Sequence, residues 1–226
     1  MKSVIEKLIL DRSFDYLQPY FYSNPYALRC ELGIGDTTEE YMKNARERAA
    51  SIYHILFPQK ADAIIFNYWI YDWSDTGDAE KRLFDGDPGD ISRIIDQRLG
   101  AETRALRFLS EMMMEYQHVS VKDLKTYDDP TDADAGSTRR NRIVCYADDI
   151  GFDDLDLIEK QIKDDKNSEV SLVSFQNECI LSVYDDRGCD IVFSTYEKMR
   201  EFYPLLKAFF LPYDLEEMEK RLARGM

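Results

Sequence analysis

Several residue types that carry common chemistry are scarce in this sequence, which has two histidines and four cysteines in 226 residues. Neither His54 nor His118 has a cysteine or a second histidine at metal-ligand spacing, so each is better explained as a structural or surface residue. The sequence contains no GxxxxGK, GxSxG or HExxH motif. It therefore lacks the signatures of phosphate-loop enzymes, serine hydrolases and zinc proteases. We predict no cofactor and no bound metal. The sequence leaves enzymatic activity open but favours a protein that is not an enzyme.

The cysteines are dispersed and form no CxxC pair, which argues against a zinc ribbon or a thioredoxin-type site. They fall on predicted strands or strand ends, where a reduced cysteine behaves as a small buried hydrophobe. The four positions are Cys30, Cys145, Cys179 and Cys189.

Long apolar runs are also missing. The longest stretch without a charged residue, 16–28, contains two prolines and is shorter than the roughly 20 residues that span a bilayer. The N-terminal apolar run is interrupted by Glu6 and Lys7 and does not resemble a secretory signal. We expect a cytoplasmic protein without membrane contact.

Basic residues are outnumbered, with 29 Lys and Arg against 44 Asp and Glu, a formal net charge of −15. Direct binding to nucleic acid is disfavoured, because such binding depends on Lys and Arg that neutralise phosphates. The same field attracts basic partners. Aromatic residues make up 13% of the chain and supply a core, which argues against disorder.

The first half of the chain contains regular patterns of apolar and polar residues that predict its secondary structure. Alternation over 27–34 predicts a strand with one buried face. Thr37 and Glu40 fit a capping box that opens a helix ending at Phe57-Pro58. The apolar run 63–71 predicts a strand covered on both faces. The ranges 91–99 and 106–116 favour helices after a polar loop at 72–90, and 125–138 has the composition of an exposed connection.

The residue pattern of the C-terminal part predicts a strand over 142–147 and an acidic helix around 155–162. It also predicts a three-stranded meander over 170–175, 179–184 and 189–193. Gly188 suits a turn with positive φ. Ser194 and Glu197 are predicted to cap a helix that ends at Pro212, and Asp214 begins a last helix. The predicted fold is α+β, a mixed or antiparallel sheet with helices mainly on one face. We expect portions 1–135 and 136–226, packed as one compact unit.

Four segments carry a resemblance to a known family. They are Ala27-Leu-Arg-Cys-Glu-Leu-Gly-Ile-Gly35, Arg48 to Pro58, and Val183-Tyr-Asp-Asp-Arg-Gly-Cys-Asp-Ile191 with Tyr213-Asp214. The chain resembles an uncharacterised bacterial family, a domain of unknown function marked by a C-terminal Tyr-Asp-Asp-Arg-Gly signature. The resemblance implies a bacterial cytosolic protein without an established activity.

The signature turn is the first candidate site, because Asp185, Asp186 and Asp190 lie close together around Arg187. Clustered carboxylates suit hard divalent metals or acid–base chemistry. Asp also favours turns for structural reasons, and an Asp–Arg pair can fasten a hairpin.

The charged face of the first strand is the second candidate. Arg29 and Glu31 would need partners if that face is covered. We expect Arg29 to pair with Asp185 or Asp186, and Glu31 with Arg187, in one four-charge network. That network can either fix the packing or bind a ligand.

An acidic segment is the third candidate, as a face for a basic protein or as a solvated surface. The segment spans 148–165, and its predicted partner face consists of Asp148, Asp149, Asp153, Asp154 and Asp156. Our leading hypothesis is a non-enzymatic, acidic protein-binding module, of which immunity and antitoxin-like proteins are examples. The alternatives are a metal- or small-ligand-binding enzyme built on the signature turn with Arg29 and Glu31, and a structural or regulatory subunit. The sequence does not give the oligomeric state.

Overall fold

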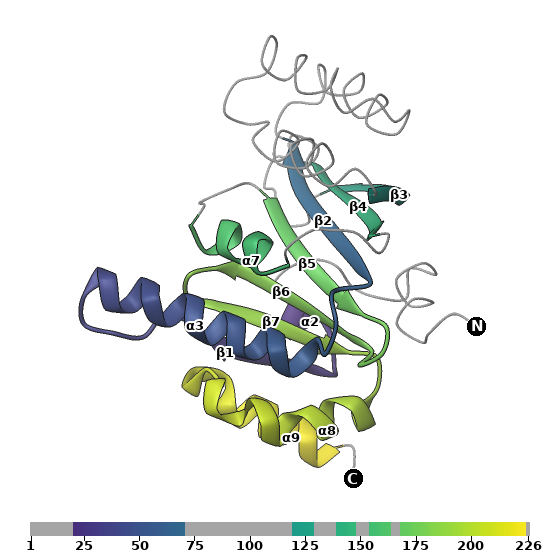
Figure 1. Cartoon of the computed structure of the whole chain (residues 1–226). Helices are drawn as coiled ribbons and strands as arrows, with labels where there is room; N and C mark the ends of the chain where they lie inside the picture. Colours follow the sequence, from purple (N-terminus) through teal and green to yellow (C-terminus); the bar gives the residue numbers. More distant parts are fainter. Residues whose placement is uncertain (1–19, 71–118, 129–138, 148–153, 164–167, 225–226) are drawn as a thin grey trace. The chain divides into compact units, whose positions relative to one another are not determined.

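The computed structural model describes residues 20–70, 119–128, 139–147, 154–163 and 168–224 (Figure 1). The described chain divides into two compact units. The first holds residues 20–62, 154–163 and 170–224, and the second holds 63–70, 119–128, 139–147 and 168–169. The predicted boundary near residue 135, the polar loop at 72–90 and the two middle helices lie outside the described residues.

The first unit contains an antiparallel sheet in the order β1-β7-β6-β5. The strands are β1 (Ala27–Glu31), β5 (Ser168–Ser174, with 170–174 in this unit), β6 (Cys179–Asp185) and β7 (Gly188–Phe193). All six residues of β7 are buried, so this strand is covered on both faces. The α+β fold predicted from the sequence is confirmed.

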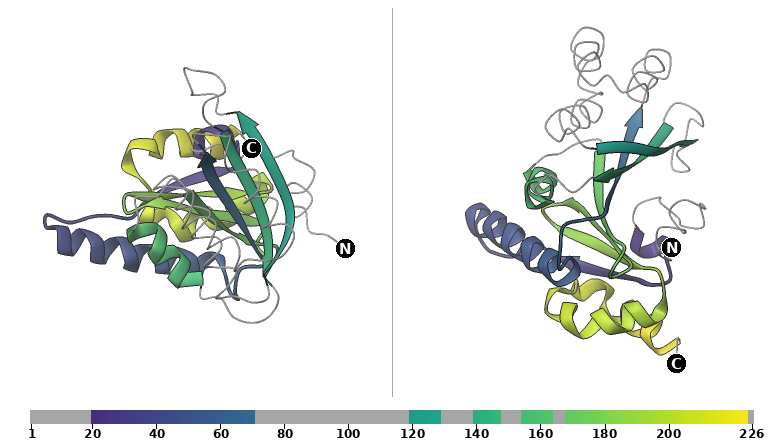
Figure 2. Two further views of the ribbon diagram at one scale, coloured as in Figure 1. Left: turned by 90° about the horizontal axis from the view of Figure 1, so that it is seen from above. Right: turned by 45° about the vertical axis from the view of Figure 1, so that its right-hand side comes forward.

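Helices cover both faces of this sheet unequally. The long α3 (Thr38–Leu56) and α7 (Asp154–Lys163) lie on one face, and the single turn α2 (Tyr20–Ser23) lies on the other (Figures 1 and 2). The C-terminal helices α8 (Tyr196–Leu206) and α9 (Leu215–Arg224) follow, joined by short 3₁₀ turns at Lys207–Phe209 and Pro212–Asp214. Within the described residues, no helix combines the length and the apolar character needed to cross a bilayer.

The predicted cap of α3 is confirmed. The Thr37 hydroxyl oxygen accepts a hydrogen bond from the Glu40 amide at 3.2 Å, which satisfies one of the free amides of the first turn. The Glu40 carboxylate reaches back to the amide of Asp36 at 3.4 Å, one residue earlier than the usual capping box. The helix ends before Pro58, as predicted.

The predicted cap of α8 is wrong by one residue. Thr195 has an extended backbone and accepts from the Lys198 amide at 3.3 Å, whereas the Ser194 hydroxyl donates to the Glu178 carboxylate at 2.5 Å. Ser194 therefore fastens the preceding strand to the β5–β6 turn. The helix also ends at Leu206, well before Pro212, because the next residues tighten into a 3₁₀ turn.

Strand β1 is shorter than predicted and ends at Glu31. Ile34, expected on the buried face, is 43% exposed. The free edge of β1 is protected, since the Arg29 amide donates to the Met218 sulfur at 3.4 Å and the Arg29 carbonyl accepts from Leu211 at 3.1 Å. These contacts fix the C-terminal segment against the edge strand and leave few groups there for another strand to pair with.

Gly188 does not adopt positive φ, contrary to the prediction. A Cβ at this position would lie 2.6 Å from the carbonyl oxygen of Cys30 and would overlap the Tyr184 hydroxyl. The glycine is required because β1 and the Tyr184 side chain approach it closely. Cys30 and Cys189 face each other across β1 and β7, and both are fully buried.

The buried cysteines agree with the prediction. Cys30, Cys179 and Cys189 are free and have no exposed surface. A hydrogen bond with Cys30, together with burial, raises the pKa of the Cys189 thiol well above its usual value. A thiol with so little thiolate is a poor nucleophile, so these positions serve packing.

The second unit contains a three-stranded antiparallel arrangement in the order β2-β4-β3. The strands are β2 (Ala63–Ile70), β3 (Val119–Asp128) and β4 (Arg139–Ala147). Strand β3 was not predicted, and residues 125–128 belong to it rather than to an exposed connection. A register shift between Val121 and Asp123 interrupts the period-2 pattern, which hid this strand in the sequence.

Candidate functional site

A buried ion pair joins the two strands at the edge of the first unit. Arg29 on β1 and Asp190 on β7 are directly opposite in the strand register. The guanidinium forms a two-point contact, with Nε 2.7 Å from Oδ1 and Nη2 3.1 Å from Oδ2. Arg29 is 8% exposed and Asp190 is fully buried. The amide of Phe21 on α2 also donates to Asp190, at 3.0 Å, so this carboxylate accepts three hydrogen bonds.

A second carboxylate completes this charged network. Asp214 Oδ2 lies 3.5 Å from Arg29 Nη1, and Asp214 Oδ1 accepts from the Tyr22 hydroxyl at 3.1 Å. Burial opposes the charge of Arg29, but the hydrogen bond and attraction to Asp190 prevail and raise the pKa of the guanidinium. Burial, followed by the nearby Asp190 charge, raises the pKa of the Tyr184 hydroxyl. The Arg29 guanidinium therefore keeps its charge inside the protein, and packing closes the network from solvent.

The predicted partners of Arg29 are wrong. Arg29 pairs with Asp190 and Asp214, whereas Asp185 accepts from Arg187 within the β6–β7 hairpin, at 2.8 Å from Nε. The register explains the difference, because residues opposite each other on one face are the ones that meet. Arg29 lies opposite Asp190, and Glu31 lies opposite Gly188.

The predicted four-charge network is therefore split in two. Arg187 is 75% exposed at its side chain and belongs to the surface turn, while Asp190 is buried with Arg29. Asp186 lies in the same turn and is partly exposed. In the part of the chain that the structure describes, no three His, Cys, Asp or Glu side chains converge as metal ligands. A binding role for Asp185, Asp186, Arg187 and Glu31 stays a prediction.

The acidic segment needs one correction. Asp154, predicted on an acidic partner face, is 2% exposed. Its Oδ2 accepts from the Tyr53 hydroxyl at 2.5 Å and from the Ala61 amide at 2.7 Å. This aspartate fastens the start of α7 to α3, through Tyr53, and to the loop after α3, through Ala61. Asp156 pairs with Lys160 along the helix at 2.8 Å. Residues 148, 149 and 153 lie outside the described residues.

The α2 turn is held from its other side by Arg221 on α9. Arg221 Nη1 donates to the carbonyls of Phe21 at 2.7 Å and Asn24 at 3.0 Å, and Nε donates to Glu217 at 3.1 Å. The Phe21 ring contacts two guanidinium groups, Arg221 at 4.1 Å and Arg29 at 5.1 Å from its centroid. Such cation–aromatic contacts strengthen when they are desolvated, and they fix the position of this turn.

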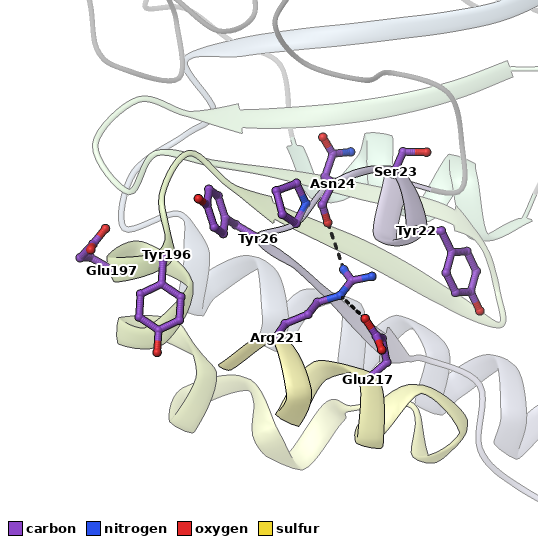
Figure 3. A pocket seen from close by; sticks show the side chains of 9 residues that line it. Tyr22, Ser23, Asn24, Tyr26, Tyr196, Glu197, Glu217 and Arg221 are labelled. Atoms are coloured by element: carbon purple, nitrogen blue, oxygen red, sulfur yellow. Dashed lines mark hydrogen bonds and ion pairs between the residues drawn. The ribbon is translucent and has the colours of Figure 1, made fainter. Parts of the chain in front are cut away.

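Next to this turn lies a groove that the sequence did not predict. It has a volume of about 510 Å³, within the range of small-ligand pockets. Figure 3 shows Arg221 and Glu217 between Tyr22 at one end and Tyr26, Tyr196 and Glu197 at the other. We call it the tyrosine groove. Its lining is Tyr22, Ser23, Asn24, Pro25, Tyr26, Tyr196, Glu197, Glu217 and Arg221.

The tyrosine groove combines aromatic faces with carboxylates. Tyr22 is 55% exposed and Tyr26 is 36% exposed, whereas the neighbouring Tyr20 and Phe21 are fully buried. The Tyr196 hydroxyl donates to the carbonyl of Leu222 at 2.6 Å, which fixes its ring. The clustering of Tyr20, Tyr22 and Tyr26 was the available sequence signal, but the other lining residues come from distant segments.

Comparison with known proteins gives the family. A model described as "Domain of unknown function (DUF3885)" matches residues 7–214. The chain belongs to this family. No curated protein and no solved structure matches the chain. The predicted membership in a family of unknown function is confirmed, whereas the bacterial origin and the signature role of 184–188 stay predictions.

Proposed function

We propose that this member of the DUF3885 family is a non-enzymatic binding module whose partner is a basic protein. The observation that carries the proposal is the tyrosine groove, an open site whose lining mixes aromatic faces with carboxylates. Such a lining suits a cationic group, which is attracted to both the ring faces and the acids. The formal net charge of −15 adds long-range attraction for a basic surface.

The buried charges support the same proposal in another way. The Arg29 guanidinium is engaged by two carboxylates and lies over the rings of Phe21 and Tyr22, so its charge is compensated inside the protein. Compensated and closed ion pairs of this kind fix packing. In the part of the chain that the structure describes, charged and aromatic groups line the accessible volume of the tyrosine groove, and we place the binding role there.

The test is capture followed by reconstitution. The full chain is cross-linked to its neighbours in the cell, and each captured protein is purified and titrated back against the free chain by calorimetry. We expect one partner that binds in a 1:1 ratio, carries a strongly positive net charge, and loses affinity as salt rises from 50 to 300 mM, because exposed charges are screened over roughly 10 Å at 0.1 M.

An unrelated basic protein of similar size and charge is the matched control, since simple attraction between opposite charges would bind it equally well. The proposal is refuted if every reconstituted partner is neutral or acidic, or if the control protein binds as tightly as the captured one. Salt-independent binding would also contradict it.

A further inference from the structure

The electrostatic balance of the tyrosine groove leaves one carboxylate for a ligand. Two glutamates and one arginine line the groove. Arg221 is engaged by Glu217 and by two backbone carbonyls, so the Glu217 charge is offset inside the lining. Glu197 is exposed and forms no ion pair with the described part of the chain. The lining therefore carries one net negative charge, and it resides on Glu197.

Two of the three tyrosines that line the groove lie at the same end as this carboxylate. Figure 3 shows Tyr26, Tyr196 and Glu197 together at that end, contributed by the segment before β1 and by the start of α8. An aromatic ring attracts a cation over its face, and a carboxylate beside the ring adds a charge-assisted hydrogen bond. The two kinds of group favour the same ligand chemistry.

The walls of the groove are preorganised. Residues 21 and 24 are held through their carbonyls by Arg221, the carbonyl of Tyr26 accepts from the Phe193 amide at 2.9 Å, and the Tyr196 hydroxyl is bound to α9. A site whose walls are already fixed loses little conformational freedom on binding. The ligand therefore meets a formed site.

We propose that the Tyr26–Tyr196–Glu197 end of the tyrosine groove binds the guanidinium group of an arginine side chain. This inference rests on the proposed function, because the arginine would belong to the basic partner. Arginine fits better than lysine, since its planar group stacks on aromatic rings and donates two parallel hydrogen bonds to a carboxylate. Lysine offers a compact, strongly hydrated point charge instead.

The test uses three capped tripeptides that differ in one side chain: acetyl-Gly-Arg-Gly-amide, its lysine counterpart and its citrulline counterpart. Citrulline keeps the shape of arginine but has no charge. The full chain, labelled with ¹⁵N, is titrated with each peptide, and the amide shifts of Tyr26, Tyr196 and Glu197 are followed. We expect saturable shifts with the arginine peptide, and at least tenfold weaker binding of the citrulline peptide.

Substitutions assign the binding to named groups. Glu197→Gln should weaken the arginine peptide about threefold to fivefold, as expected for an exposed ion pair, and Tyr26→Leu should weaken it by a similar factor. The matched controls are Glu201→Gln, on the same helix as Glu197, and Tyr213→Leu. Tyr213 is 86% exposed and lies outside the groove, so both controls should leave the affinity unchanged. All four positions are exposed, and thermal melts verify that each variant folds.

The inference is overturned by equal affinities for the arginine and citrulline peptides, or for the arginine and lysine peptides. Unchanged affinity in both Glu197→Gln and Tyr26→Leu overturns it as well. Its failure is distinguishable from failure of the proposed function. A basic partner that binds these two variants as tightly as the parent chain would keep the basic partner and reject arginine binding at the Tyr26–Tyr196–Glu197 end. Arginine binding at that end without any basic partner would keep this inference and reject the proposed function.

Discussion

Removing the carboxylate of Asp190 should destabilise the first unit strongly. This side chain is fully buried and accepts hydrogen bonds from Arg29 Nε at 2.7 Å, Arg29 Nη2 at 3.1 Å and the Phe21 amide at 3.0 Å. In Asp190→Ala the Arg29 guanidinium stays buried with Asp214 alone, at 3.5 Å. Breaking one partner of a buried pair costs about 3–5 kcal/mol.

The assay is urea unfolding followed by far-ultraviolet circular dichroism, with a thermal melt alongside. A loss of about 3–5 kcal/mol should lower Tm by about 6–20 °C for a chain of this length. Asp186→Ala, in the exposed turn of the same hairpin, is the control and should change the unfolding free energy by less than about 0.5 kcal/mol.

A double-mutant cycle separates the ion pair from simple loss of packing. Arg29→Met combined with Asp190→Ala removes the unbalanced cation, so the double variant should lose clearly less than the sum of the two single variants. A loss below about 1 kcal/mol in Asp190→Ala, or strict additivity in the cycle, would refute the reasoning.

Three further predictions follow from the packing. Gly188→Ala should lower the unfolding free energy by about 1–3 kcal/mol, because its Cβ would meet the Cys30 carbonyl; denaturant unfolding tests this, and an unchanged midpoint contradicts it. Asp154→Ala should cost about 1–3 kcal/mol by leaving the Tyr53 hydroxyl and Ala61 amide without this acceptor, while Asp156→Ala on the same helix should cost under about 0.5 kcal/mol; similar losses in the two variants would contradict the assignment. The pKa of Tyr184 is raised in the folded protein, so its protonated hydroxyl contributes fully to stability below the ordinary pKa of 10.0. Above that pH the unfolding free energy should fall by up to about 1.4 kcal/mol per pH unit. Unfolding measured from pH 9 to 11.5 should therefore decline less steeply in Tyr184→Phe than in the parent chain, and parallel declines would exclude this group.

Local sequence patterns predicted the elements that depend on neighbouring residues. The cap at Thr37 and the stop before Pro58 define α3 because both act within one helical turn. Strand β3 escaped prediction because its register shift between Val121 and Asp123 breaks the alternation that marks a strand. Gly188 was assigned to the correct hairpin but for the wrong reason, since close approach between strands is not visible in a single segment.

The candidate sites depend on longer-range relations. Arg29 was predicted to need a buried partner, and it has one, but the choice of Asp190 follows from the register of β1 and β7. Asp214, which is 185 residues away along the chain, reaches Arg29 because the C-terminal segment lies against the edge of β1. The tyrosine groove combines 22–26, 196–197, 217 and 221, segments that no local pattern relates to one another.

Hydrogen–deuterium exchange of the chain alone and in its reconstituted complex tests the central claim most directly. If the chain binds a basic partner through the tyrosine groove, the complex should slow amide exchange in peptides covering 22–26 and 196–199, because those amides become shielded and their local opening is suppressed. The exposed start of α3, around Glu39, should exchange at the same rate in both states. Protection confined to other segments, with unchanged exchange at 22–26 and 196–199, would contradict the account.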